Sequence, residues 1–421
     1  MAQDDGKAPD GAGGTGPRPS HGATVVTGGV PPREAPAASA LRPRIVLPLL
    51  AGIAVAGSQM FIVSPLLPDI ARDLGQSISS LGLAVSGGSL GTAVMAALSV
   101  PVLDRFPRVG VLTGALAFLA AMIALVAAST SFAVFAVAFA LAGAAVGVLL
   151  PTTYALAADI SAEHERTRLL GLVLLGWSLS FFLQPVASEF GDVLGWRGAF
   201  ALIAGVALLT ALADLTLPRR APAGTGIGFS AYGAALAIPA VKPLLGACVA
   251  FMAAFYGVYP YWGAAFRAAH GGDASAASVL AVAYGAGFMI SGLIVSRWLA
   301  RYSTWVVLIG AVLCLVATYS VLGRAIADER SIIAWAFGLG LVNNAGLSSL
   351  IGSLASLSNE RRGSLMAIYS AVTYVGFTVG AAAMGPVFER YGIGVNGAVS
   401  ASILVMGLLS AIIARRASLR R

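Results

Sequence analysis

Polar residues interrupt the apolar stretches of this 421-residue chain, and their types are suited to binding rather than to bond making. Gln59 lies inside one apolar stretch, and Asn343 and Asn344 lie near the centre of another. A buried amide needs a hydrogen-bonding partner, which a neighbouring helix or a ligand supplies. Adjacent helical residues point about 100° apart, so the two asparagines cannot face one packing neighbour. This favours a cavity role for the asparagine pair, whereas packing and binding are equally supported for Gln59.

Aromatic residues gather in segment 255–262, which reads Phe-Tyr-Gly-Val-Tyr-Pro-Tyr-Trp. Pro260 cannot donate to the helical hydrogen-bond ladder, so we predict a break in the helix here. Tyr256 lies before the break and is expected to face a cavity. Tyr261 and Trp262 lie after it and fit an aromatic belt at a membrane surface.

Two further groups share the same chemistry. Trp177, Phe181 and Gln184 are spaced i, i+4 and i+7 and therefore lie on one helical face. Tyr369 and Tyr374 lie near the centre of another apolar stretch. Aromatic faces with a few amides suit a flat organic molecule that is neutral or weakly cationic. A phosphorylated or dicarboxylate substrate would instead require basic residues in the pocket.

Ionisable residues are missing from the middle of every apolar stretch, although a carboxylate at mid-membrane often marks an ion relay. If protons are coupled to the reaction, Asp69 and Glu189 at the ends of stretches are the best candidates, because each can face an outward cavity. The alternative is that both are helix caps at the membrane surface. Neither a metal motif nor a cofactor motif is present, and Cys248 and Cys314 are expected to be buried packing residues.

The composition indicates the elements that must position these residues. The chain is 58% apolar and only 10% charged, whereas soluble domains carry roughly 25% charged residues. A membrane-spanning helix needs about 20 apolar residues. Twelve such spans are predicted, and they make an all-α membrane protein with two pseudo-symmetric bundles of six helices: Ile45–Leu67, Ser80–Val102, Val109–Ala128, Phe132–Ala157, Leu169–Phe190, Gly198–Leu217, Pro243–Phe266, Ser278–Trp298, Thr304–Leu322, Ser331–Leu357, Gly363–Phe388 and Ile393–Ala414.

Basic residues give an independent test of this count. When alternate connections are assigned to the same side, twenty of the 26 lysines and arginines fall on the side of both termini. The positive-inside rule then places both termini in the cytoplasm of a multi-pass protein of the cell (inner) membrane. The basic residues form short caps between spans rather than one patch, so no nucleic acid is expected as a partner.

The chain is expected to divide into five parts. Residues 1–43 lack aromatic residues and are rich in glycine and proline, which predicts a disordered cytoplasmic tail. The two six-helix bundles cover residues 44–217 and 243–414. A cytoplasmic linker spans residues 218–242, and a basic cytoplasmic tail spans residues 415–421. Short sequence echoes support a repeat: Glu165-Arg166-Thr167-Arg168 precedes the fifth span, and Glu360-Arg361-Arg362-Gly363 precedes the eleventh.

Twelve spans with this repeat resemble the major facilitator superfamily (MFS) of secondary transporters. Asp104, Arg105 and Arg108 are similar to that family's loop motif G-x-x-x-D-R-x-G-R-R, although Val100 and Pro107 replace its glycines. Ser64-Pro65-Leu66-Leu67-Pro68-Asp69 and Gly195-Trp196-Arg197-Gly198 resemble segments of the bacterial drug:proton antiporter branch with 12 transmembrane helices. Phe139 stands where many members of that branch carry an arginine.

The resemblance implies transport by alternating access, with a substrate bound between the two bundles. Asp104, Arg105 and Arg108 would then form a latch for one access state; otherwise they are a solvated turn. We expect proton-coupled efflux of a small hydrophobic or amphipathic compound, a drug or a metabolite. Uptake of a nutrient by the same fold is the alternative, and a polytopic membrane enzyme or sensor is the alternative of another class. The expected partners are the lipid bilayer, a small-molecule substrate and protons, and a monomer without cofactor or metal and without enzymatic activity is expected.

Overall fold

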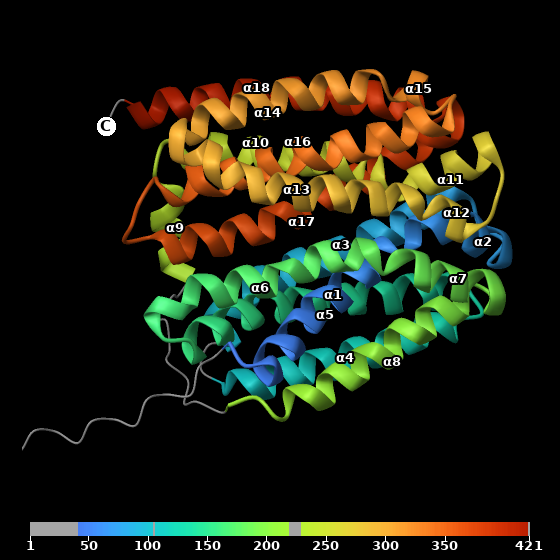
Figure 1. Ribbon diagram of the computed structural model, residues 1–421, viewed down its shortest axis with the longest axis horizontal. Coiled ribbons are helices and arrows are strands. Elements are labelled where there is room, and N and C mark those ends of the chain that lie inside the picture. Colours follow the sequence, from blue (N-terminus) through green and yellow to red (C-terminus); the bar gives the residue numbers. More distant parts are fainter. Residues whose placement is uncertain (1–40, 104–105, 219–228, 420–421) are drawn as a thin grey trace, which may run out of the picture. The chain divides into compact units, whose positions relative to one another are not determined.

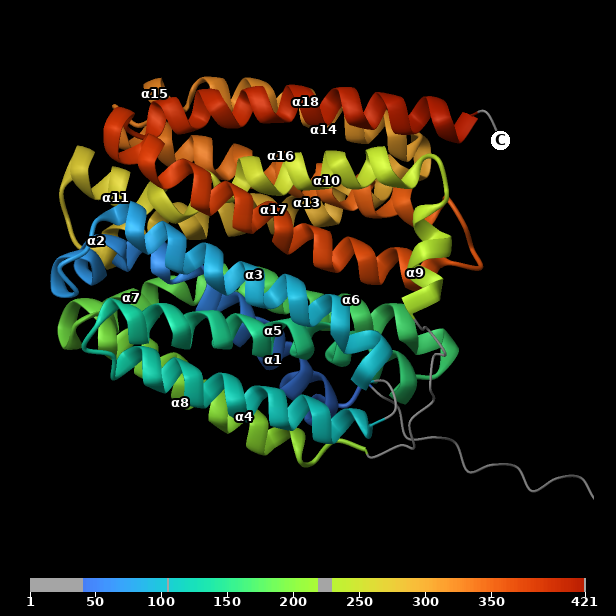
Figure 2. The same cartoon turned by 180° about the vertical axis from the view of Figure 1, so that it is seen from behind.

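The computed structural model describes residues 41–103, 106–218 and 229–419, and all regular secondary structure in these ranges is helical. Figures 1 and 2 show the helices running side by side. The helices before the linker are α1 (Pro43–Phe61), α2 (Val63–Asp73), α3 (Ile78–Leu103), α4 (Arg108–Ala127), α5 (Phe132–Ile160), α6 (Glu163–Phe182), α7 (Gln184–Leu194) and α8 (Trp196–Asp214). We refer to α1–α8 as the first half.

The later helices are α9 (Phe229–Leu236), α10 (Val241–Tyr256), α11 (Tyr259–His270), α12 (Ala274–Ala277), α13 (Val279–Arg301), α14 (Thr304–Ser320), α15 (Leu322–Ala325), α16 (Glu329–Ala355), α17 (Arg362–Tyr391) and α18 (Ile393–Leu419). We refer to α10–α18 as the second half. Within the described residues, eleven helical stretches are long and apolar enough to cross a membrane, and the 17-residue α14 is a shorter apolar helix. The twelve expected spans thus correspond to helical segments of the structure.

Three of the expected spans are broken into two helices. The first breaks between α1 and α2, the fifth between α6 and α7, and the seventh between α10 and α11. The break after Tyr256 was expected from Pro260, which occupies the first turn of α11, where a missing N–H costs nothing. The first and seventh spans are equivalent in the repeat, so the two halves share this feature.

Small residues allow the closest helix approaches. A Cβ added to Gly143 on α5 would lie 1.9 Å from the carbonyl oxygen of Gly88 on α3. In the second half, a Cβ on Gly340 of α16 would lie 2.1 Å from the carbonyl oxygen of Tyr284 on α13. Both pairs join the second and fourth spans of their half, so the repeat is visible in packing as well as in sequence.

Apolar side chains also cover much of the outer surface, as lipid contact requires. Val137 is 60% exposed, Leu209 is 67% exposed and Met406 is 68% exposed, on α5, α8 and α18. In water such exposure would be costly, whereas lipid tails solvate it. Cys248 is buried as expected, but Cys314 on α14 is exposed, so that expectation was wrong for Cys314.

The short helix α9 connects the halves at one end of the structure (Figure 1). The Tyr232 hydroxyl donates a hydrogen bond to the carbonyl of Ala97 on α3 at 3.3 Å. Arg361, just before α17, donates to the carbonyl of Ala234 at 3.0 Å. We name this end, where α1 begins and α18 ends, the termini end, and we name the opposite end, where α2, α7, α11 and α12 lie, the far end.

Candidate functional site

Aromatic rings from both halves meet where the three broken helices come together. Phe61 of α1 stacks on Phe181 of α6 with centroids 4.5 Å apart, and both rings contact Tyr259 of α11. Tyr256 of α10 stacks on Phe377 of α17 at 4.1 Å. We name these rings and their neighbours the aromatic cluster; its members are Phe61, Phe181, Phe255, Tyr256, Tyr259, Trp262, Tyr284 and Phe377.

The two helices on either side of the break between α10 and α11 contribute four of these rings to the cluster. Gly257 leaves no room for a side chain, because a Cβ there would lie 2.9 Å from the Cγ of Met384. The Nδ2 of Asn396 on α18 donates to the carbonyl of Gly257 at 2.9 Å and to that of Met384 at 3.2 Å. Asn396 therefore satisfies a carbonyl that the broken helix leaves without its intrahelical partner.

Two amides within the aromatic cluster keep an oxygen free. The Nε2 of Gln184 donates to the hydroxyl of Tyr259 at 2.7 Å, and Gln59 is buried next to Tyr256. The Oε1 atoms of both glutamines are buried without a hydrogen-bond partner. Gln59 also borders a cavity of about 10 Å³ with Ser89, which is room for about one water. Two unpaired acceptors in an apolar setting are available to donor groups of a ligand.

Toward the termini end, the site becomes partly accessible. The Nε1 of Trp177 donates to the hydroxyl of Tyr154 on α5 at 3.0 Å. Tyr369 and Tyr374 of α17 lie near Tyr154, across the interface between the halves. Trp177, Tyr154 and Tyr369 are only half-buried, whereas the aromatic cluster is buried.

The structure thus brings together most of the cavity residues expected from the sequence. Gln59, Phe181, Gln184 and Tyr256 belong to the aromatic cluster or touch it, and Tyr374 packs edge-on against Phe377. Trp177 contacts Phe61, with centroids 6.1 Å apart. These residues come from α1, α6, α7, α10 and α17.

The asparagine pair lies apart from this group. Asn343 is buried on α16. The Oδ1 of Asn344 accepts a hydrogen bond from Ser348 at 3.2 Å, and its Nδ2 faces Gly292 of α13. No hydrogen bond between described residues joins either asparagine to the aromatic cluster.

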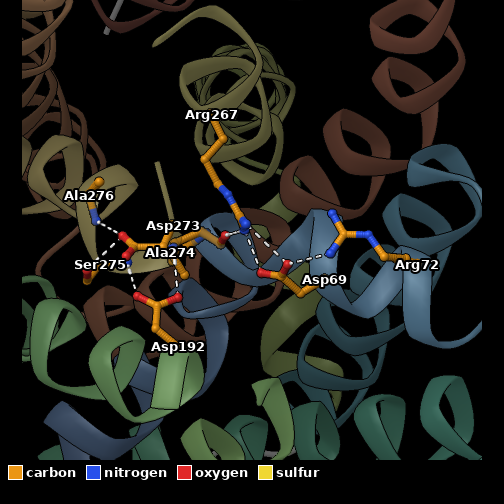
Figure 3. Close-up of polar contacts among 9 residues, drawn as sticks. Asp69, Arg72, Asp192, Arg267, Asp273, Ala274, Ser275 and Ala276 are labelled. Carbon is orange, nitrogen blue, oxygen red and sulfur yellow. Dashed lines mark hydrogen bonds and ion pairs between the residues drawn. The ribbon is translucent and has the colours of Figure 1, made fainter. Parts of the chain in front are cut away.

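The expected proton carriers occupy different surroundings. Asp69 at the far end is bound by Arg267 of α11, with Nη1–Oδ2 and Nη2–Oδ1 distances of 2.5 and 3.1 Å (Figure 3). Arg72 adds a longer contact to Asp69 at 3.5 Å. Glu189 on α7 is exposed. Asp69 thus links the two halves through Arg267.

The expected latch is only partly visible. Asp104 and Arg105 lie outside the described residues. Arg108 is buried at the start of α4, and its Nε lies 3.0 Å from the Oδ2 of Asp159 on α5. This ion pair stays within the first half.

The expectation that Tyr261 and Trp262 lie in a belt at the membrane surface was wrong, because both side chains are buried and Trp262 belongs to the aromatic cluster. Sequence reasoning also missed several members of the site. Tyr154, Tyr284 and Asn396 are polar or aromatic residues inside apolar stretches, which is the signal that selected the other candidates. Arg267 also carried a signal, since it is one of only six basic residues assigned to the side away from the termini.

Comparisons with known proteins identify the family of the chain. Residues 49–266 match the model of the Major Facilitator Superfamily. YwfA of Bacillus subtilis (strain 168), an uncharacterized MFS-type transporter, is 31% identical over 388 residues, which are 88% of this chain and 92% of YwfA. A chloramphenicol resistance protein of Streptomyces lividans is 29% identical over 191 residues, 45% of this chain and 48% of that protein.

A solved structure has the same fold. It is the inward-facing, unoccupied structure of a bacterial homolog of the human lysosomal transporter Spinster. The TM-score is 0.70 at 16% identity, with 89% of this chain and 96% of that chain covered. The helical architecture, the match of the family model and the full-length similarity to YwfA agree: the chain belongs to the major facilitator superfamily of membrane transporters.

Proposed function

We propose that this transporter exports a small hydrophobic or amphipathic compound, neutral or weakly cationic, in exchange for protons. The observation that carries the proposal is the pair of buried amide oxygens without a hydrogen-bond partner, Gln59 Oε1 and Gln184 Oε1, beside the aromatic cluster. An aromatic or apolar body would stack on the rings, and its hydroxyl or N–H groups would donate to the two oxygens.

The charge pattern supports the same substrate class. The ring and hydrogen-bond partners of the aromatic cluster in the described residues are aromatic, amide, hydroxyl and backbone groups. A dicarboxylate or a phosphate ester would lose its hydration there without gaining a cationic partner, which is costly in an apolar site. A weak cation would gain from the faces of the rings.

The closed far end is compatible with the first step of export. Contacts across the halves close the far end, while Trp177, Tyr154 and Tyr369 are partly accessible toward the termini end. The positive-inside pattern supports a cytoplasmic termini end. In this state a compound would reach the aromatic cluster from the cytoplasm, which is the step at which an exporter takes up its substrate.

Proton coupling is proposed to act through Asp69. Protonation would remove the charge that Arg267 binds, and the far end would lose its strongest contact between the halves. A proton arriving from outside would thus favour the open far end from which the compound leaves. Uptake of a nutrient remains the competing function, and the same experiment separates the two.

The test uses purified protein in proteoliposomes with an imposed pH gradient. Chloramphenicol is the first compound, because of the similarity to the resistance protein of S. lividans, and a panel of neutral and weakly cationic aromatic compounds follows. We expect the compound to move in the direction opposite to the protons. The transport rate should fall about tenfold in Gln59→Ala and in Gln184→Ala, which is the order expected for a lost hydrogen bond of 1–1.5 kcal/mol. Gln76→Ala, in the α2–α3 turn outside the cluster, is the matched control. Transport in the direction of the proton gradient would instead support uptake, and equal transport by all three variants would reject the site.

A further inference from the structure

Two exposed carboxylates at the far end each bind the backbone of the opposite half. Asp192, near the end of α7, accepts hydrogen bonds from the backbone N–H groups of Ala274 and Ser275, where α12 begins; the distances are 3.0 and 2.8 Å (Figure 3). Glu389, near the end of α17, accepts one from the N–H of Ser79 at the start of α3 at 2.8 Å.

These two contacts are related by the internal repeat. α7 completes the fifth span and α12 opens the eighth, whereas α17 is the eleventh span and α3 is the second. The fifth and eleventh spans are equivalent in the repeat, as are the second and eighth. Each half therefore offers one carboxylate to the other half, and each receives one at the first turn of its own second span.

The physical basis of both contacts is the same. The first N–H groups of a helix have no intrahelical acceptor, and they carry partial positive charge. A carboxylate placed there is a favourable partner, worth about 0.3–1 kcal/mol at an exposed position, and it is favourable only while the two halves touch. At Glu389 the helices approach closely: a Cβ on Gly385 would lie 3.0 Å from the Cα of Ser79.

We propose that Asp192 and Glu389 are a symmetry-related pair of positioning residues that hold the far end closed. Both act on the balance between access states, and neither contacts the aromatic cluster in the described structure. The inference goes beyond the proposed export function, because it concerns which state is populated and not which compound or ion is carried. Asp69 and Arg267 supply a third contact between the halves at the same end, but that contact is a side-chain ion pair.

The chemistry of the acceptors distinguishes the two positions. Asp192 uses both oxygens, Oδ1 for Ala274 and Oδ2 for Ser275. An asparagine can offer only one acceptor oxygen, and its NH₂ group would then face a backbone N–H. Glu389 uses only Oε1, so a glutamine keeps the hydrogen bond and loses only the charge. Asp192→Asn should therefore open the far end more than Glu389→Gln does.

The experiment measures distances between spin labels in proteoliposomes. Cys314 is replaced by serine, and cysteines are introduced at exposed positions Leu194 and Arg330 at the far end, or His164 and Glu360 at the termini end. We expect Asp192→Asn and Glu389→Gln each to raise the fraction of molecules with a long Leu194–Arg330 distance about two- to fivefold. The His164–Glu360 distance should shorten in the same fraction. The double variant should multiply the two effects, because the contacts share no partner.

The matched control is Asp328→Asn. Asp328 also lies at the far end and also accepts a hydrogen bond from a backbone N–H in the first turn of a helix, but its partner Ser331 belongs to its own half. It should leave both distances unchanged. Asp192→Glu keeps the charge, is expected to open the far end less than Asp192→Asn, and serves at this position if Asp192→Asn does not fold. Unchanged distances in the neutral variants, a response in only one of the two, or an equal response in Asp328→Asn would overturn the proposal.

Discussion

Arg267 of α11 binds Asp69 of α2 through two parallel hydrogen bonds, although 198 positions separate them in the chain. The same guanidinium also donates to the carbonyl of Pro65 at 3.1 Å. Arginine suits this geometry because its planar fork matches a carboxylate. This relationship makes Asp69 the better placed of the two expected proton carriers, since Glu189 is exposed.

The first prediction concerns coupling. Asp69→Asn should abolish transport driven by a pH gradient while exchange of substrate across the membrane without a gradient continues, because the asparagine cannot carry a proton. Glu189→Gln should leave both activities within about twofold of the unmodified protein, as surface substitutions generally do. The measurement is tracer flux in proteoliposomes with and without the gradient. Gradient-driven transport that survives in Asp69→Asn would reject Asp69 as the coupling residue.

The second prediction concerns substrate affinity at the partly accessible end of the site. Tyr154→Phe removes the acceptor of Trp177 Nε1 and keeps the ring, so substrate affinity should fall by up to about tenfold, corresponding to about 1 kcal/mol for one hydrogen bond. Trp177→Phe should cause a similar loss, and the double variant should lose less than the sum because the two residues share the bond. Binding measured by quenching of tryptophan fluorescence or by calorimetry tests this. If the affinity losses of the two single variants add fully in the double variant, the hydrogen bond between Trp177 and Tyr154 does not contribute to substrate binding.

The third prediction concerns packing between α3 and α5. Gly143→Ala would place a Cβ against the carbonyl of Gly88, and such overpacking typically costs about 1–3 kcal/mol. Gly114→Ala on α4 meets no atom within 4 Å and is the control. Thermal unfolding in detergent should show a lower midpoint for the first variant and an unchanged or slightly higher midpoint for the second. Equal midpoints would show that the close approach is not required.

The fourth prediction concerns the broken seventh span. Asn396→Ala leaves the carbonyl of Gly257 without its side-chain donor in a buried setting, and the free energy of unfolding should fall by about 1–3 kcal/mol. The exposed Asn359 provides the control, because Asn359→Ala removes no side-chain contact of this kind. Unfolding followed by circular dichroism compares the variants. A stable Asn396→Ala protein would mean that the break is held by packing alone.

The fifth prediction concerns acid. Hydrogen bonds from Arg197 and then from Trp196 lower the pKa of the exposed Asp73 carboxyl below its ordinary value of 3.8. A carboxyl whose pKa is lowered in the folded state stabilises the folded protein at pH values above its ordinary pKa. This contribution disappears as the pH falls through the lowered pKa. Because the side chains of Asp73 and Arg197 are both exposed, the contribution should stay below about 1 kcal/mol. Asp73→Asn should reduce the difference in melting temperature between pH 6 and pH 3, and an unchanged difference would contradict this.

Much of the fold could be predicted from the sequence because hydropathy alone identifies membrane spans. The break at Pro260 could also be predicted, since proline lacks the N–H that a helix needs for its backbone hydrogen bonds. The breaks after Phe61 and after Phe182 were not predicted, although Pro185 lies in the first turn of α7 as Pro260 lies in the first turn of α11. The membership of the drug:proton antiporter branch stays a prediction.

The site was readable in part. Residues such as Gln59 and Tyr256 were found because polar or aromatic groups inside apolar stretches are conspicuous. Their partners were not, because the pairing of Tyr256 with Phe377 depends on which faces of α10 and α17 meet, and no local spacing encodes this. Asn343 and Asn344 carried the same signal and yet lie apart from the aromatic cluster.

The short helix α9 has a mechanical consequence. Its Tyr232 hydroxyl donates a hydrogen bond to the carbonyl of Ala97 in the first half, and its Ala234 carbonyl accepts one from Arg361 in the second half. If the halves move apart at the termini end, either one of these hydrogen bonds must break or α9 must move with one of the halves. We expect the segment between the halves to act as a strap that limits how wide the termini end can become.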